Sequence, residues 1–128
     1  MIIGCGIDLV NIKRIENIII KWGDNFIFRV FTLSEKEYCE GKTNKYQSYA
    51  GKFAAKEALL KALGIGLRGV NWKEIEIRNN NYGQPNINLH GKLNKIASQK
   101  RVNKYFLSIS HTKENALAEV ILESQAHI

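Results

Sequence analysis

The spacing of apolar residues divides the chain into a first half that is mainly helical and a second half rich in strands. Residues 1–10 form an apolar run that predicts a β-strand ending at or near Asp8. Asn11 is a good helix N-cap and Gly23 a good terminator, so we expect a helix over residues 12–22. The helical repeat of its large apolar residues predicts a core-facing stripe of Ile12, Ile15, Ile19 and Trp22.

Further helices are predicted in the next part of the chain. Residues 24–31 are typical of a short helical piece, and a capping box at residues 34–37 starts another short helix. A polar, basic loop over residues 41–47 follows. Residues 51–64 are rich in Ala, Leu, Lys and Glu and form the longest predicted helix, which Gly64 would end.

The second half of the chain shows the alternation that is typical of strands. Residues 72–79 and 87–90 are predicted strands, joined by a turn that contains the only proline. A helix over residues 91–100 follows. The last two predicted strands, 104–110 and 116–122, are joined by a hairpin.

This order of elements predicts the fold class. We expect an α+β domain with a mainly antiparallel sheet, on which a long central helix and shorter helices pack. No internal repeat or linker is visible, so residues 1–123 should form one domain and residues 124–128 a frayed tail. The chain has 128 residues, 45% of them hydrophobic, which is enough for a real core.

The charge narrows the choice of partners without selecting one. The formal net charge is +7, which favours nucleic acid, an anionic membrane, a phosphorylated metabolite or an acidic protein. No targeting segment is visible, and no apolar run is long enough to span a bilayer. Cys5 and Cys39 match no disulfide framework or zinc spacing, so we interpret both as reduced thiols of a cytoplasmic protein.

An acid and a base lie one turn apart on the longest predicted helix, within an arc that is otherwise apolar or small. Glu57 and Lys61 stand in the favoured order for an exposed ion pair, which is worth about 0.3 kcal/mol. Leu59 and Leu63 make another side of the helix apolar, which favours burial, and a buried pair loses solvation. The alternative to a surface pair is that a metal ion or a phosphate binds both side chains.

Two predicted strand ends carry polar groups. Asp8 is either an acid stabilised by the following helix dipole or a metal ligand. Ser110 and His111, in the segment "SISHT", are either a polar strand end or groups that hold phosphate oxygens. Because they are adjacent on a strand, they point to opposite faces and cannot pair as nucleophile and base.

The order of these motifs resembles one family closely. "GCGIDLVNIKRI" is followed by "FAAKEALLKALG", "YGQP" and "SISHT", and the resemblance extends from Ile2 to about Glu123. The chain is similar to holo-(acyl-carrier-protein) synthase, the small, stand-alone type of 4′-phosphopantetheinyl transferase. The resemblance implies transfer of the phosphopantetheine arm of coenzyme A to a serine of an acyl carrier protein, with adenosine 3′,5′-bisphosphate as by-product.

The same resemblance implies roles for individual residues. Asp8 and Glu57 match two carboxylate ligands of Mg²⁺, and Lys61 would point at the same pyrophosphate. Together with His111 they are the expected catalytic residues, and the general base stays open between His111 and a water held by the metal or a carboxylate. The expected coenzyme-binding residues are Lys45, Lys52, Lys61, Gly64, Gly83, Pro85, Ser110 and His111.

Two positions within the matching motifs depart from the usual pattern of the family. Lys52 stands where relatives often have Arg, which gives up bidentate geometry toward the 3′-phosphate that Lys45 and Lys52 are expected to approach. Gln84 stands where relatives commonly have Lys, so the charge contact that they make there is in question.

A partner surface is predicted on the first helix. Arg14, Ile18 and Lys21 recur at i, i+4 and i+7, away from the core stripe, and Arg14 matches a carrier-contacting position of the family. Because acyl carrier proteins are strongly acidic, we expect this face to dock the carrier; the alternative is an ordinary solvated face. Relatives form cyclic trimers with active sites between subunits, so a homotrimer is expected.

Two other interpretations compete with this one. A basic nucleic-acid-binding module would suit the charge, but the chain shows no RNP-like aromatic strand, zinc spacing or recognition helix. An inactive coenzyme A-binding relative is disfavoured because Asp8, Glu57, Lys61 and His111 occur together. We therefore expect neither a nucleic-acid partner nor a membrane partner.

Overall fold

The computed structural model describes residues 1–125, in which helices and antiparallel strands form an α+β fold. The class predicted from the sequence is therefore confirmed. In chain order the elements are β1 (Ile2–Asn11), α1 (Ile12–Trp22), α2 (Asp24–Val30), α3 (Leu33–Glu40), α4 (Lys45–Leu63), the 3₁₀ helix η1 (Trp72–Glu74), β2 (Ile75–Asn79), β3 (Pro85–Leu89), α5 (Gly91–Gln99), β4 (Val102–His111) and β5 (Asn115–Ser124).

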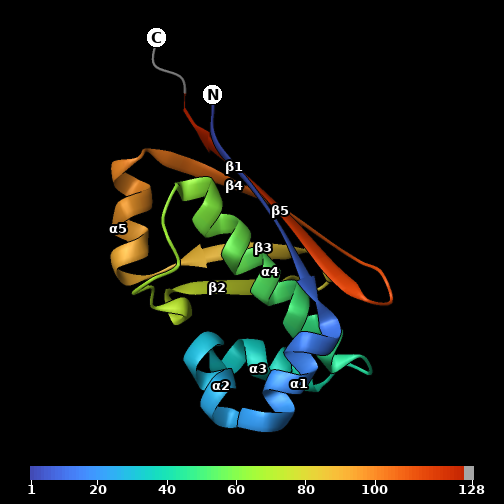
Figure 1. Ribbon diagram of the computed structural model, residues 1–128. Coiled ribbons are helices and arrows are strands. Elements are labelled where there is room, and N and C mark those ends of the chain that lie inside the picture. Colours follow the sequence, from blue (N-terminus) through green and yellow to red (C-terminus); the bar gives the residue numbers. More distant parts are fainter. Residues whose placement is uncertain (126–128) are drawn as a thin grey trace.

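The strands form two antiparallel sheets. The larger sheet has the order β1–β5–β4, and β2 pairs with β3 in a separate two-stranded sheet. Helix α4 packs along the larger sheet, α1–α3 gather at one end of the molecule, and α5 lies near the other end of α4 (Figure 1). Over residues 1–125, no helix is both long and apolar enough to cross a bilayer.

The contact between β1 and α4 depends on two glycines. A Cβ on Gly6 would collide with the carbonyl oxygen of Ala58, and a Cβ on Gly4 would collide with that of Ala62. Such close backbone approach is a typical reason for glycine inside a strand. It lets the end of β1, with Asp8, lie directly beside the middle of α4.

A fully buried ion pair joins α4 to α3. Lys56 and Glu35 are both 0% exposed, with Nζ and Oε1 2.7 Å apart. Lys56 Nζ also donates to Val30 O at 2.6 Å, while the Glu35 carboxylate accepts from the backbone N–H groups of Thr32 and Ile77. Burial lowers the pKa of Lys56, and the Glu35 carboxylate opposes that shift.

Several predicted boundaries shift in the structure. The capping box of α3 is formed by Thr32 and Glu35, so the prediction of residues 34–37 was displaced by two residues. Helix α4 begins at Lys45, which makes the loop before it shorter than predicted. Residues 72–74 form η1, so that strand begins only at Ile75.

The predicted stripe of α1 is correct for Ile15 and Ile19, which are buried, and wrong for Trp22, which is 55% exposed. At the other end of the chain, β5 includes Ser124, whose backbone N–H donates to Met1 O at 2.8 Å. Residues 126–128 of the predicted tail lie outside the described residues.

Candidate functional site

Asp8, Glu57 and Lys61 meet where the end of β1 lies against α4. Asp8 comes from the strand, while Glu57 and Lys61 are one turn apart on the helix. Lys61 Nζ donates to Asp8 Oδ1 at 2.8 Å and to Ile7 O at 3.0 Å. The Asp8 side chain is only 10% exposed, whereas that of Lys61 is 52% exposed. Two carboxylates and an ammonium therefore share one half-buried site, which is the arrangement that the resemblance to the family implied.

The two carboxylates repel each other. Burial, followed by the charge of Asp8, raises the pKa of Glu57 from 4.5 to about 7, against the opposing charges of Lys61 and Arg14. A like charge at close range disfavours ionisation of an acid, and a cation between the two removes that cost.

The donor set fits a hard divalent cation. Within residues 1–125, no group of three or more His, Cys, Asp or Glu side chains is placed to hold a metal ion. Mg²⁺, however, is commonly bound through one or two carboxylates, with water and substrate phosphates as its other ligands. Asp8 and Glu57 could provide such a pair of carboxylates.

The raised pKa predicts a pH-dependent stability of the metal-free protein. Between pH 4.5 and about 7 the folded state retains a proton on Glu57 that the unfolded state has lost, so unfolding releases it and stability falls as pH rises. Glu57→Gln removes this dependence. We expect the Tm of Glu57→Gln to rise relative to that of the wild type as the pH increases from 4.5 to about 7, and the difference to stay constant above pH 7. Glu37→Gln on the exposed surface is the control. A Tm difference that does not change with pH would contradict the raised pKa of Glu57.

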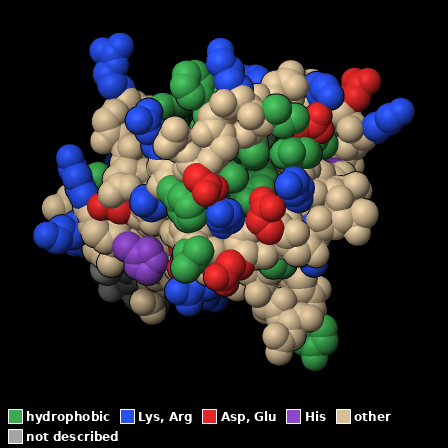
Figure 2. Space-filling model, turned by 90° about the horizontal axis from the view of Figure 1, so that it is seen from below, with side chains coloured by type: hydrophobic (Ala, Val, Ile, Leu, Met, Phe, Trp, Pro, Cys, Tyr) green, Lys and Arg blue, Asp and Glu red, His purple; other side chains and the backbone are tan. Residues whose placement is uncertain are grey.

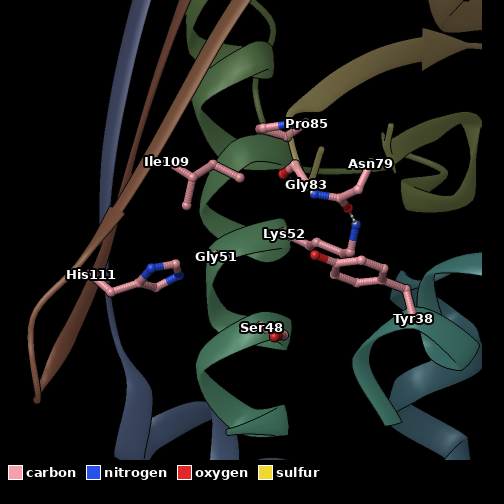
Figure 3. A pocket seen from close by; sticks show the side chains of 9 residues that line it. All are labelled: Tyr38, Ser48, Gly51, Lys52, Asn79, Gly83, Pro85, Ile109 and His111. Carbon is pink, nitrogen blue, oxygen red and sulfur yellow. Dashed lines mark hydrogen bonds between the residues drawn. The ribbon is translucent and has the colours of Figure 1, made fainter. Parts of the chain in front are cut away.

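A second group of residues surrounds a cavity of about 160 Å³ on another side of α4. His111 and Ile109 reach it from β4, Lys52 and Ser48 from α4, and the β2–β3 turn closes it from above (Figure 3). Four of the predicted coenzyme-binding residues line this cavity together: Lys52, Gly83, Pro85 and His111.

Sequence reasoning missed three polar residues of the cavity. Tyr38, Ser48 and Asn79 also line it. Ser48 precedes Lys52 by one helical turn, so helical spacing was a usable signal for it. Tyr38 and Asn79 come from α3 and β2 and carry no local signal, because only the fold brings these elements to α4.

The imidazole of His111 is held against α4. A Cβ on Gly51 would lie 3.0 Å from His111 Nε2 and 3.1 Å from Ile109 Cγ2, so glycine makes room for both side chains. Burial lowers the pKa of His111, which favours the neutral ring at pH 7. A neutral imidazole has one donor and one acceptor and can hydrogen-bond to a ligand.

Besides Lys61, which lies in the carboxylate site, three predicted coenzyme-binding residues lie away from this cavity. Ser110 is exposed on the opposite face of β4, Lys45 pairs with Glu40 at 3.4 Å, and Gly64 ends α4 beside a separate hollow that Lys61 and Lys100 also line. Gln84 Oε1 accepts from Asn80 Nδ2 at 3.0 Å within the β2–β3 turn. The roles of these residues stay predictions.

The carboxylate site and the cavity occupy opposite flanks of α4. Ser48 and Glu57, like Lys52 and Lys61, are nine residues apart, which is about two and a half turns at about 3.6 residues per turn. One chain therefore presents the carboxylate site and the cavity on sides of α4 that face away from each other.

The predicted carrier face lies on α1 and continues onto α2. Arg14 and Lys21 are exposed, as expected, whereas Ile18 is half-buried. Ile18 also lines a groove of about 580 Å³ with Trp22, Asn25, Phe26 and Arg29. Seen from the α1–α3 end, hydrophobic side chains gather near the middle of the surface among charged ones (Figure 2).

Comparison with known proteins agrees with these observations. The sequence model of the 4′-phosphopantetheinyl transferase superfamily matches residues 4–119. A holo-(acyl-carrier-protein) synthase of Geobacter metallireducens is 44% identical over 124 residues, which cover 96% of this chain and 98% of the relative. The chain therefore belongs to the 4′-phosphopantetheinyl transferase superfamily.

The solved structures that this chain resembles are holo-(acyl-carrier-protein) synthases. The holo-(acyl-carrier-protein) synthase of Neisseria meningitidis has a TM-score of 0.88 at 34% identity, covering 97% of this chain and 100% of that one. The synthase of Bacillus anthracis, solved in complex with coenzyme A (3′,5′-ADP), has a TM-score of 0.78 at 37% identity, covering 98% and 99%. The resemblance stated from the sequence is confirmed.

Proposed function

We propose that this protein is a holo-(acyl-carrier-protein) synthase, which transfers the 4′-phosphopantetheine arm of coenzyme A to a serine of apo acyl carrier protein. The observation that carries this conclusion is the meeting of Asp8, Glu57 and Lys61 in a chain of this superfamily. The serine oxygen forms a bond to the phosphorus that carries the pantetheine arm. The bond from that phosphorus to adenosine 3′,5′-bisphosphate breaks, and the serine proton passes to a base.

Asp8 and Glu57 would hold a Mg²⁺ ion, and Lys61 would contact the pyrophosphate. The ion, when bound, neutralises phosphate charge and orients the reacting groups. Lys61, whose side chain is 52% exposed, would turn from Asp8 toward the phosphates if Asp8 held a cation. The low exposure of Asp8 strengthens these electrostatic contacts.

The cavity beside His111 is the proposed site for the nucleotide end of coenzyme A. Tyr38, Ser48 and His111 supply hydrogen-bonding groups, and Gly83 and Pro85 form a wall. Its volume of about 160 Å³ is below the roughly 300–1,000 Å³ of most small-molecule sites. One chain therefore encloses only part of such a large ligand.

The decisive experiment is a transfer assay. Apo acyl carrier protein, coenzyme A and Mg²⁺ are incubated with the protein, and the carrier is weighed by mass spectrometry. We expect the carrier to gain the mass of one phosphopantetheine, and EDTA to prevent the gain. An unmodified carrier, beside a known synthase that works in parallel, would refute the function.

We further propose that the protein is a homotrimer whose active sites lie between subunits. The position of the two sites on opposite flanks of α4 supports this proposal. The carboxylate site of one copy can then face the nucleotide cavity of the next copy. The face of the larger sheet that points away from α4 also supports it. That face is rich in exposed apolar side chains, a common mark of an interaction surface: Ile7, Leu9, Phe106 and Leu117.

Charge on this sheet face should break the assembly. Phe106 is 48% exposed, and Phe106→Lys places an ammonium where an apolar contact is proposed. We expect sedimentation to show a trimer for the wild type, a monomer for Phe106→Lys, and little transfer activity in the monomer. Ile20→Lys, at a 66% exposed position on α1, is the matched control and should remain trimeric. A fully active wild-type monomer would contradict the shared site.

The face on α1 and α2 is the proposed docking site for the carrier protein. Arg14 and Lys21 supply positive charge at its edge, Arg29 adds a third cation, and Ile18 and Trp22 supply apolar surface in the groove. An acidic carrier helix would match both features. Charges at the rim of an interface act mainly on the association rate and on its salt dependence.

Lys21→Glu tests this face more cleanly than Arg14→Glu, because the charge of Arg14 also acts on Glu57. We expect Lys21→Glu to raise the KM for carrier protein several-fold, to weaken its response to salt, and to leave the KM for coenzyme A nearly unchanged. Lys92→Glu on α5 is the control for net charge. Steady-state kinetics at two salt concentrations decide the matter; equal effects of both variants would count against docking on α1.

A further inference from the structure

The ammonium of Lys52 is bound within the protein although the residue lines the cavity. Lys52 is 3% exposed. Its Nζ donates to Ile77 O at 2.8 Å and to Asn79 Oδ1 at 2.7 Å, and lies 4.5 Å from the centre of the Tyr38 ring (Figure 3). A lysine ammonium has three N–H donors, so these acceptors use two of them, and the ring covers a further side.

The hydrogen bonds continue from Lys52 to the wall of the cavity. Asn79 is the last residue of β2, and its Nδ2 donates to Gly83 O in the β2–β3 turn at 3.0 Å. Gly83 and Pro85 both line the cavity. A continuous path of two side chains thus connects the middle of α4 to the turn that closes the cavity.

We propose that Lys52 is a positioning residue, which fixes the β2–β3 turn over the nucleotide cavity through Asn79 and does not bind the 3′-phosphate of coenzyme A directly. The inference rests on the proposed function and refines it. An arginine at this position would have five donors and could hold both a protein acceptor and a phosphate. Lysine has three donors, and two of them are already engaged here, while the Tyr38 ring packs against the ammonium. Direct contacts to the ligand then fall to the groups that face the cavity, such as Ser48 and His111.

Two variants separate positioning from direct binding. Lys52→Met removes the ammonium, whereas Asn79→Ala cuts the path to Gly83 and keeps the ammonium. Affinities for coenzyme A and for 3′-dephospho-coenzyme A are measured by calorimetry with Mg²⁺ present. If Lys52 positions the turn, both variants should weaken both ligands by a similar factor, about ten-fold, and keep the preference for the 3′-phosphate within about three-fold of wild type.

Kinetics supply a second readout. The carboxylate site lies on the other flank of α4, so both variants should raise the KM for coenzyme A while kcat stays near the wild-type value. A general loss of folding would lower the amount of active enzyme and leave KM unchanged. Asn86→Ala, in the same hairpin and without a bond to Lys52, is the matched control and should leave both affinities unchanged.

Several outcomes would overturn the proposal. A direct, charge-assisted bond to the phosphate is worth about ten-fold or more in affinity. If Lys52→Met abolishes the preference for the 3′-phosphate and Asn79→Ala keeps it, Lys52 binds the phosphate directly. If Lys52→Met does not fold, Asn79→Ala decides alone, and unchanged affinities for both ligands would refute the path. A wild type that binds no coenzyme A would instead refute the proposed function, and the inference with it.

Discussion

Lys56→Met is expected to lower the free energy of unfolding by about 3–5 kcal/mol. The substitution keeps the length of the side chain but leaves the Glu35 carboxylate, which is 0% exposed, as a buried charge without its cation. It also removes the donor that satisfies Val30 O. Both losses occur where water cannot replace the missing partner, so the cost is that of an unpaired buried charge. Urea unfolding of metal-free protein at pH 7 measures it.

Two controls identify the cause of that loss. Lys13→Met removes the cation of an exposed pair, in which Lys13 is 72% exposed, and should cost less than about 1 kcal/mol. Lys56→Met combined with Glu35→Gln should cost less than the sum of the two single changes, because no buried charge is then left alone. A Lys56→Met protein as stable as Lys13→Met, or a strictly additive double variant, would show that the pair is not coupled.

The capping box of α3 is a feature whose exact position could not be predicted from the local sequence. The segment "TLSEKE" contains two overlapping matches to the motif, one starting at Thr32 and one at Ser34. The structure uses Thr32, because the Glu35 carboxylate also binds Lys56 and the N–H of Ile77. Those partners lie 21 and 42 residues away along the chain, so no local pattern distinguishes the two matches. Helix ends set by a local cap alone, such as Asn11 before α1, were predicted correctly.

The residues of the candidate site could also be predicted from the sequence, but the contacts between them could be predicted only in part. Asp8, Glu57 and Lys61 carried signals of their own, since charged groups stood next to apolar positions of a strand and a helix. Their meeting depends on the close contact of β1 and α4, for which the glycines of β1 gave the only hint. The engagement of Lys52 could not be predicted, because its acceptors lie on β2, 25 and 27 residues away. The chemical character of a side chain can be inferred from the local sequence, whereas the groups that it contacts are determined by the fold.

Asp8→Asn and Glu57→Gln should each reduce kcat/KM for phosphopantetheine transfer by about 10²–10³-fold. This is the typical loss when one electrostatic support of a transition state is removed. Both carboxylates are proposed to hold one Mg²⁺ ion, so they act as a unit. The double variant should then be about as slow as the slower single variant, because residues of one unit lose the same function. Transfer to carrier protein, measured at saturating Mg²⁺, tests the expectation.

Binding of the metal provides a second test of the same pair. Each single variant should raise the Mg²⁺ concentration required for half-maximal activity, while the Tm of Glu57→Gln without metal stays at or above that of the wild type, since its repulsion with Asp8 is gone. Glu16→Gln, which changes a partly exposed carboxylate on α1, is the control and should behave as the wild type in both measurements. If the losses of the two single variants multiply in the double variant, Asp8 and Glu57 act independently. If Glu57→Gln transfers at the normal rate, Glu57 is a surface acid of α4 and the metal lies elsewhere.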